Sequence, residues 1–162
     1  MIFVLEILVY LILFTLSVVI VVKNGPVDGI FFYPKPVQDR VLELGLTDKA
    51  TVKRRSIVYI VLLMLGVIGL PIVFIGICNQ VTDFKIAFLQ ALILLEVMNW
   101  YDAIMIDFVW VRHSKFWIIP GAEDLPYAKT WSYIIKKRTL ATIMYVPIAA
   151  LIGWLALLAG RL

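Results

Sequence analysis

The sequence predicts an all-α integral membrane protein, a bundle of four transmembrane helices with both termini outside the cell. Three observations lead to this prediction. Hydrophobic residues make up 63% of the 162-residue chain, and its mean hydropathy is +1.00. Four stretches reach the roughly 20 apolar residues that a helix needs to cross a bilayer. Lysine and arginine are concentrated in two of the connecting loops. The length suits a single transmembrane domain, residues 1–162, without a separate soluble domain.

The four predicted spans cover residues 1–22, 57–78, 86–111 and 140–160. The second and fourth spans contain no charged residue, and the first contains only Glu6. The first span lacks a basic start and an Ala-x-Ala cleavage site, so we expect a retained helix rather than a signal peptide. The third span contains Glu96, Asp102 and Asp107. Because intramembrane carboxylates face the interior of a bundle, this helix should be packed away from lipid.

Charge sets the expected orientation in the membrane. Thirteen of the 15 lysine and arginine residues lie in two loops, residues 23–56 and 112–138, and the other two are Lys85 and Arg161. The positive-inside rule places these two loops in the cytoplasm, and a multi-pass protein of the cell membrane follows. The net charge of +4 is then explained by basic loops beside anionic lipid, so we expect lipid and no nucleic acid as a partner.

Both loops contain apolar runs and should form a structured cap. Residues 30–33 and 116–119 are aromatic and aliphatic stretches too short to span a bilayer, so they belong at its interface. A short amphipathic helix should begin at Pro36 and end at Gly45. A second short helix, starting at Tyr127, should lead into the fourth span.

Small residues predict where the helices approach closely. Two spans contain such residues at helical spacing, namely Gly66, Gly69 and Gly76 in the second and Ala149, Gly153, Ala156 and Gly160 in the fourth. Small side chains let two helix backbones come together in lipid. We therefore expect helix contact here rather than a hinge or a pore lining.

The third span contains the candidate site. On a helical wheel Glu96, Asn99 and Asp107 share one face, while Asp102 lies about 120° from Glu96 and flanks that face. Glu96 lies about 15 Å along the helix from Ile86, close to the bilayer midplane, where a charge costs at least ~2.5 kcal/mol. No predicted span contains a lysine or arginine at that depth. Glu96 should then be protonated, bind a cation or ligand amine, face a water-filled cavity or pair with another subunit. The simplest alternative is an interhelical hydrogen bond shared with Asn99.

The cytoplasmic end of the third span adds two basic candidates. Arg112 and His113 follow the carboxylates directly and can reach the interface. A metal site built from His113 with Glu123 or Asp124 is disfavoured, because the spacing matches no metal-binding motif. We therefore predict no metal and no cofactor. The candidate ligand-binding residues are Glu96, Asn99, Asp102, Asp107, Arg112 and His113.

Three classes of function remain open. The first is binding or transport of a cation, a proton or an amphiphilic ligand by a homo-oligomer or with a partner membrane subunit. The second is an enzyme acting on a lipid or isoprenoid at the cytoplasmic face, which requires a cleft that opens sideways to lipid. The third is a non-catalytic assembly subunit. The sequence contains no phosphate-binding glycine loop, no nucleophile elbow and only one cysteine, Cys78.

Overall fold

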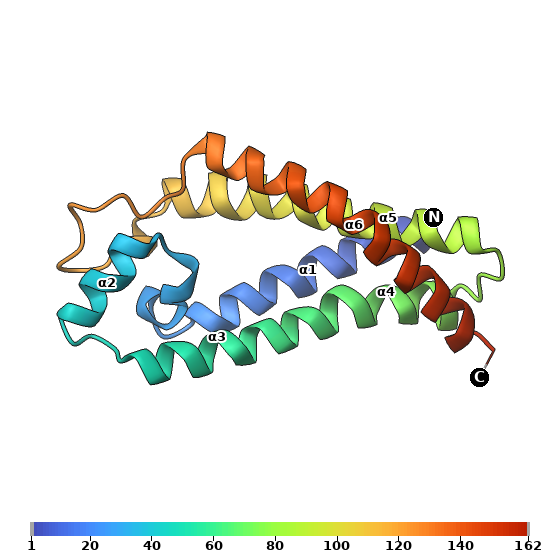
Figure 1. Cartoon of the computed structure of the whole chain (residues 1–162), viewed down its shortest axis with the longest axis horizontal. Helices are drawn as coiled ribbons and strands as arrows, with labels where there is room; N and C mark the ends of the chain where they lie inside the picture. The colour runs from blue at the N-terminus through green and yellow to red at the C-terminus, as the bar shows by residue number, and fades with distance from the viewer. Residues whose placement is uncertain (1, 162) are drawn as a thin grey trace.

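The computed structural model describes residues 2–161, and all of the regular structure in that part of the chain is helical (Figure 1). Four long helical rods make up most of the structure. The first rod is α1 (Ile2–Val22). The second rod is continuous and consists of α3 (Lys49–Met64), η2 (Leu65–Gly69), α4 (Leu70–Ile72) and η3 (Val73–Cys78). The third rod consists of α5 (Phe84–Tyr101) and η4 (Asp102–Val111), and the fourth is α6 (Trp131–Ala159).

Three of these rods are long and apolar enough to cross a membrane, namely Ile2–Val22, Lys49–Cys78 and Trp131–Ala159. Their outward faces consist of exposed aliphatic side chains such as Leu65 and Ile143, which are 64% and 63% exposed. Apolar surface on this scale fits lipid better than water. The all-α prediction is confirmed, and the membrane-spanning character is supported by these three rods. The third rod is not one of the three, so four spans remain a prediction.

Two rods begin earlier than the apolar stretches that predict them. The second begins at Lys49 and the fourth at Trp131, whereas the predicted spans begin at residues 57 and 140. Each start is capped, because Asp48 accepts a hydrogen bond from the Thr51 N–H and Thr130 accepts one from the Tyr133 N–H. A helix continues through polar residues once it is capped. Arg138 accordingly lies inside α6, as expected of the helix that leads into the fourth span, although this helix begins at Trp131 and not at Tyr127.

Small residues let the fourth rod approach the second and third rods closely at one end of the molecule. The backbone of Gly76 lies against that of Ala156, and a Cβ atom added at Gly153 would lie 3.0 Å from the Phe88 backbone nitrogen. Close contact is therefore confirmed for these glycines. Gly66 and Gly69 have no neighbouring atom within 4 Å of an added Cβ, so the predicted contact is wrong for them.

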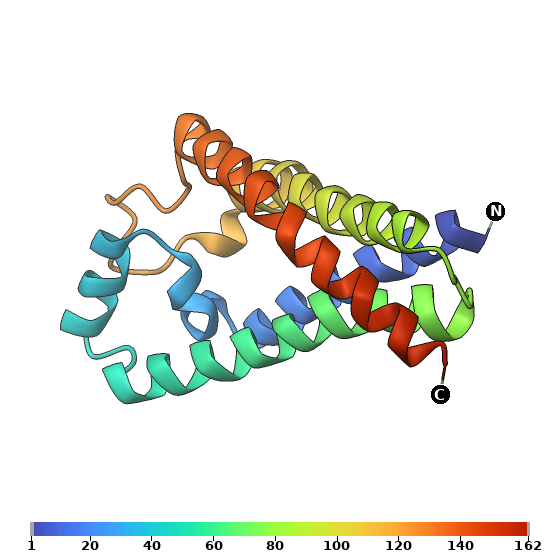
Figure 2. The same cartoon turned by 45° about the vertical axis from the view of Figure 1, so that its right-hand side comes forward.

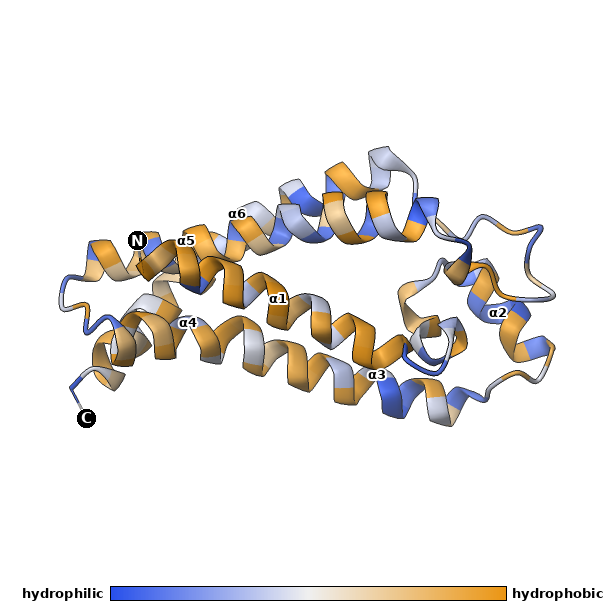
Figure 3. Ribbon diagram, turned by 180° about the vertical axis from the view of Figure 1, so that it is seen from behind, coloured by the Kyte–Doolittle hydropathy of each residue, from blue (hydrophilic) through white to orange (hydrophobic). Residues whose placement is uncertain are grey.

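The two basic loops fold into a cap at the opposite end from the two termini (Figure 1). The cap contains η1 (Pro26–Phe32), α2 (Lys35–Glu43) and η5 (Lys115–Trp117). Trp117 is 2% exposed, and its carbonyl oxygen accepts a hydrogen bond of 2.9 Å from the Tyr33 hydroxyl. Burial raises the pKa of Tyr33, so the hydroxyl stays neutral and remains a donor. Hydrophilic residues gather in α2 and at the start of α3, whereas hydrophobic residues dominate α1 and α4 (Figure 3).

Two separate cores result from this arrangement. One core surrounds the glycine contacts and includes Ile75, Leu94 and Ile152. The other lies in the cap and includes Val41 and Trp117. α6 crosses the second rod near the C-terminus and diverges from α3 toward the cap (Figure 2). The diverging helices leave space between the two cores.

Candidate functional site

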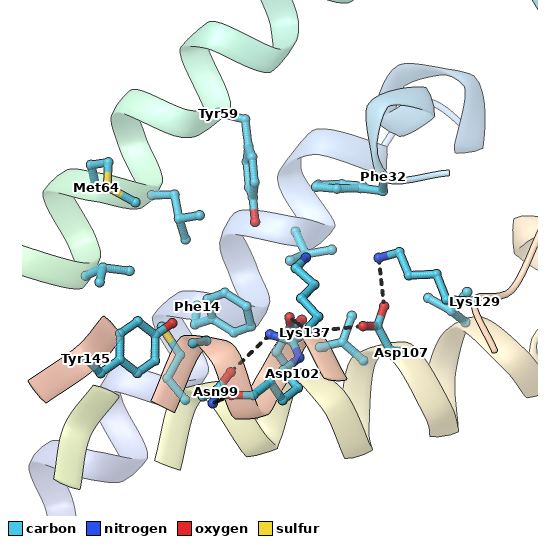
Figure 4. A pocket seen from close by; sticks show the side chains of 18 of the residues that line it. Phe14, Phe32, Tyr59, Met64, Asn99, Asp102, Asp107, Lys129, Lys137 and Tyr145 are labelled. Atoms are coloured by element: carbon cyan, nitrogen blue, oxygen red, sulfur yellow. Dashed lines mark hydrogen bonds and ion pairs between the residues drawn. The ribbon is translucent and has the colours of Figure 1, made fainter. Parts of the chain in front are cut away.

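A cavity of about 430 Å³ lies between the two cores, lined by α3, α6, the third rod, α1 and the cap (Figure 4). One end is charged. The polar and charged side chains that line it are Asn99, Asp102, Asp107, Lys129, Lys137 and Arg138. The remaining lining is mainly aromatic and aliphatic, with Phe14, Met64 and Ile148 among the apolar residues.

Arg138 is the centre of the charged end. Its side chain is 8% exposed and forms ion pairs with both Asp102 and Asp107. The Arg138 Nη2 atom lies 3.0 Å from Asp107 Oδ2. Lys129 forms a second ion pair with Asp107, with 3.5 Å between Nζ and Oδ1. Both carboxylates of η4 are therefore neutralised by cations that follow them in the chain.

The π-helical geometry of η4 explains why Asp102 and Asp107 meet the same arginine. An α-helical wheel places these two residues on different sides. In a π-helix each backbone N–H bonds to the carbonyl five residues earlier, so residues five apart approach a common face. Asp102 and Asp107 are five apart and lie within η4. Asp102 was expected to lie beside Asn99, and both residues contact Arg138, but the α-helical wheel overstated the angle between Asp102 and Asp107 because it assumed a regular α-helix.

Glu96 and Asn99 contact α6 through Thr142. The Thr142 hydroxyl donates a hydrogen bond of 2.9 Å to Glu96 Oε2, and Asn99 Nδ2 lies 3.5 Å from the same hydroxyl oxygen. Asn99 also donates to the Arg138 carbonyl oxygen and accepts from the Arg138 guanidinium. Thr142 thus connects the two side chains that were expected to bond directly. Glu96 Oε1 is buried without a hydrogen-bond partner among residues 2–161, and Glu96 does not line the cavity.

Arg112 and His113 do not contact these carboxylates. Arg112 donates to the Lys129 carbonyl oxygen at 2.9 Å, and its guanidinium lies 5.4 Å from the centre of the Phe108 ring. The exposed His113 ring places Nδ1 2.9 Å from the Phe108 carbonyl oxygen. Arg112 therefore positions the backbone of Lys129, and neither residue lines the cavity. Within residues 2–161, no three His, Cys, Asp or Glu side chains come together as a metal site would need.

Four residues of the site, Lys129, Lys137, Arg138 and Thr142, were not predicted from the sequence. A signal was available for two of them. Thr142 lies seven residues before Ala149, and Arg138 four residues before Thr142, so both extend the small-residue stripe of the fourth span along one helix face. Lys129 lies in an irregular segment, and its position follows only from the folded cap.

The cavity reaches the surface of the protein between α3 and α6. Leu63 and Met64 line one side and Ala141, Ile148 and Leu151 the other. Met64 and Leu151 are 44% and 51% exposed while they also line the cavity, so they form the rims of an opening.

The chain matches no family model, no curated protein and no solved structure. The function is therefore inferred from the residues that line the cavity. Its charged end contains three cations and two carboxylates, and its open side is apolar. Such a site can hold a polar group at one end and a hydrocarbon chain at the other.

Proposed function

We propose that this protein binds an amphiphilic ligand, a molecule with a polar headgroup and an apolar tail, in the cavity between α3 and α6. One observation carries the proposal. The cavity combines a charged end with apolar walls, and its opening lies between two helices that are apolar enough to cross a membrane. A ligand that enters sideways from lipid meets apolar residues first and charged residues at depth.

The membrane placement is part of the proposal. All four rods span the bilayer, and the third rod does so with Asp102 and Asp107 turned toward α6 and neutralised by Arg138. The cap lies in the cytoplasm of a multi-pass cell-membrane protein, and both termini lie outside. Two features support this orientation: most basic residues are in the cap loops, and both termini lie at the opposite end (Figure 1).

An amphiphile fits the site better than a free cation or proton. A cation needs unpaired carboxylate oxygens, yet Asp107 is shared by Arg138 and Lys129, and Asp102 is paired with Arg138. The cavity also has one more positive than negative side chain. A cation would therefore bind in competition with Arg138 and Lys129.

An enzyme acting on a lipid or isoprenoid is the second candidate. The sideways opening that such an enzyme requires is the observation that favours it. A catalyst needs an acid or base that is free to exchange a proton with the ligand. Both cavity carboxylates are held in ion pairs, and this arrangement places binding ahead of catalysis.

The proposal is tested by filling the cavity. Ala141 lines it, and the Ala141→Trp variant places a large side chain inside. Ala150 lies on the same helix, is half-buried and does not line the cavity, so Ala150→Trp is the matched control. Both variants and the wild type are reconstituted in nanodiscs of bacterial polar lipid, released and analysed by native mass spectrometry.

We expect wild-type protein and Ala150→Trp to retain one amphiphile per chain after release, and Ala141→Trp to retain none. Retention by Ala141→Trp at the wild-type level would contradict the proposal. Far-UV circular dichroism of each variant in the same detergent checks that helix content is unchanged. Conversion of the retained molecule during incubation would favour the enzyme over the binding protein.

A further inference from the structure

Lys137 is the one cation of the cavity that takes no part in the ion-pair network. It lines the cavity from α6, and it forms no ion pair with any residue of the described part of the chain, 2–161. Its neighbour Arg138 is occupied by two carboxylates. The ammonium of Lys137 therefore leaves three N–H donors for another molecule.

Two further donors surround the same space. The Lys129 Nζ atom lies 3.5 Å from Asp107 Oδ1, a long ion-pair distance, and points into the cavity beside Lys137 (Figure 4). The Tyr59 hydroxyl points into it from α3 on the opposite wall. The Tyr59 ring is held there by Phe32, with 5.0 Å between the ring centres. Three donors, from α6, from the segment that precedes it and from α3, thus line one region of the cavity.

We infer that the ligand is an anionic phospholipid, whose phosphate is bound by Lys137 with Lys129 and Tyr59 and whose tail leaves between α3 and α6. This inference rests on the proposed function and names its ligand class. A phosphate offers more acceptor oxygens than a carboxylate, so it can serve donors on several walls. A headgroup with its own cation is disfavoured, because the cavity already contains an excess positive charge.

The surroundings of the opening fit the tail of such a lipid. Leu63, Met64 and Leu151 provide apolar walls beyond the charged end. A smaller apolar groove between α1 and the second rod shares Leu63, Val67 and Met98 with the cavity and extends the apolar surface. Free inorganic phosphate would use the lysines but none of these walls.

The test measures headgroup preference in the whole protein. Nanodiscs contain phosphatidylglycerol, phosphatidylcholine and oleate in equal mole fractions, and native mass spectrometry reports which molecule stays bound. The variants are Lys137→Gln and Lys136→Gln. Lys136 is the adjacent residue of the same helix, is exposed and does not line the cavity, so it controls for the loss of one charge.

We expect wild-type protein and Lys136→Gln to retain phosphatidylglycerol several-fold above its share of the bilayer, and Lys137→Gln to retain the three molecules in bulk proportion. The Lys137→Arg variant should keep the preference, which separates the role of the charge from any folding defect. Equal preference in wild type and Lys137→Gln, or retention of oleate in place of phospholipid, would overturn the inference.

Two outcomes separate this inference from the proposed function. If Ala141→Trp loses its lipid but Lys137→Gln keeps the headgroup preference, the phosphate assignment fails and amphiphile binding stands. If Ala141→Trp keeps its lipid, the proposed function itself fails. Delipidated protein is also incubated with inorganic phosphate alone, and a stable phosphate adduct under these conditions would overturn the assignment to a lipid headgroup.

Discussion

Replacement of Arg138 by methionine is the perturbation with the largest expected effect on stability. The change keeps an unbranched side chain of similar length and removes the guanidinium. Asp102 and Asp107 then lose the cation they share, and Asn99 Oδ1 loses a donor. Only Lys129 remains as a partner, and it contacts Asp107 alone.

The size of the effect follows from burial. Removing one member of a buried ion pair costs about 3–5 kcal/mol, because the other member remains desolvated. The Asp102 and Asp107 side chains are 24% and 15% exposed, so water in the cavity relieves part of this cost. We therefore expect Arg138→Met to lower the free energy of unfolding by about 3 kcal/mol, roughly a hundredfold in the folding equilibrium.

The assay is reversible unfolding by dodecyl sulfate in mixed micelles, followed by circular dichroism of the helices. Lys136→Met is the control, since Lys136 is exposed and forms no ion pair with residues 2–161. A triple variant that adds Asp102→Asn and Asp107→Asn should recover most of the loss, because no buried charge is then left unpaired. A change below about 0.5 kcal/mol in Arg138→Met, the range of an ordinary surface substitution, would refute this reasoning.

Three further predictions follow from particular contacts. Gly76→Ala should destabilise the protein by about 1–3 kcal/mol in the same unfolding assay, because the added Cβ meets the backbone of Ala156. Gly69→Ala should not, because the added Cβ enters open space, and equal effects of the two variants would contradict the close contact at Gly76. Thr142→Val should lower the free energy of unfolding by about 1–3 kcal/mol, because Glu96 loses the hydroxyl that donates to it. An unchanged free energy of unfolding in Thr142→Val would contradict this hydrogen bond. Hydrogen bonds from the first turn of α3 lower the pKa of Asp48, so its contribution to stability is present above the ordinary carboxyl pKa and is lost as pH falls through the lowered value. The protection of the amides at the start of α3, measured by hydrogen exchange and corrected for the intrinsic exchange rate at each pH, should therefore fall in acid. Asp48→Asn should remove that pH dependence, and an unchanged protection profile in the variant would contradict it.

Composition and charge were enough to predict the membrane class and the all-helical fold. The long apolar runs need a lipid-like surrounding, and the outward Leu65 and Ile143 side chains agree with that. The cap and its amphipathic helix were predictable too, because Pro36 and Gly45 mark helix limits that agree with α2 within two residues. The contact of Gly76 with the fourth helix followed from residue size alone.

The charged cluster was only half predictable. Glu96, Asn99, Asp102 and Asp107 were recognisable because polar residues stand out in an apolar span. Arg138 contacts Asn99, Asp102 and Asp107, but it was counted only among the basic residues of the cytoplasmic loop that set the orientation, and it was not predicted to be a site residue. The π-helical geometry that turns Asp102 toward the arginine leaves no signature in local spacing, and it depends on contacts formed only in the folded chain.

The most direct test of ligand binding uses a phospholipid with a photoreactive diazirine in its tail. After irradiation in membranes, peptide mass spectrometry locates the cross-links. If the cavity binds an amphiphile, labels concentrate on Leu63, Met64, Ile148 and Leu151, the apolar lining of the opening, and disappear in Ala141→Trp. Labels spread evenly over outward residues such as Leu65 and Ile143, with no effect of Ala141→Trp, would show that lipid only surrounds the protein, and would contradict the account.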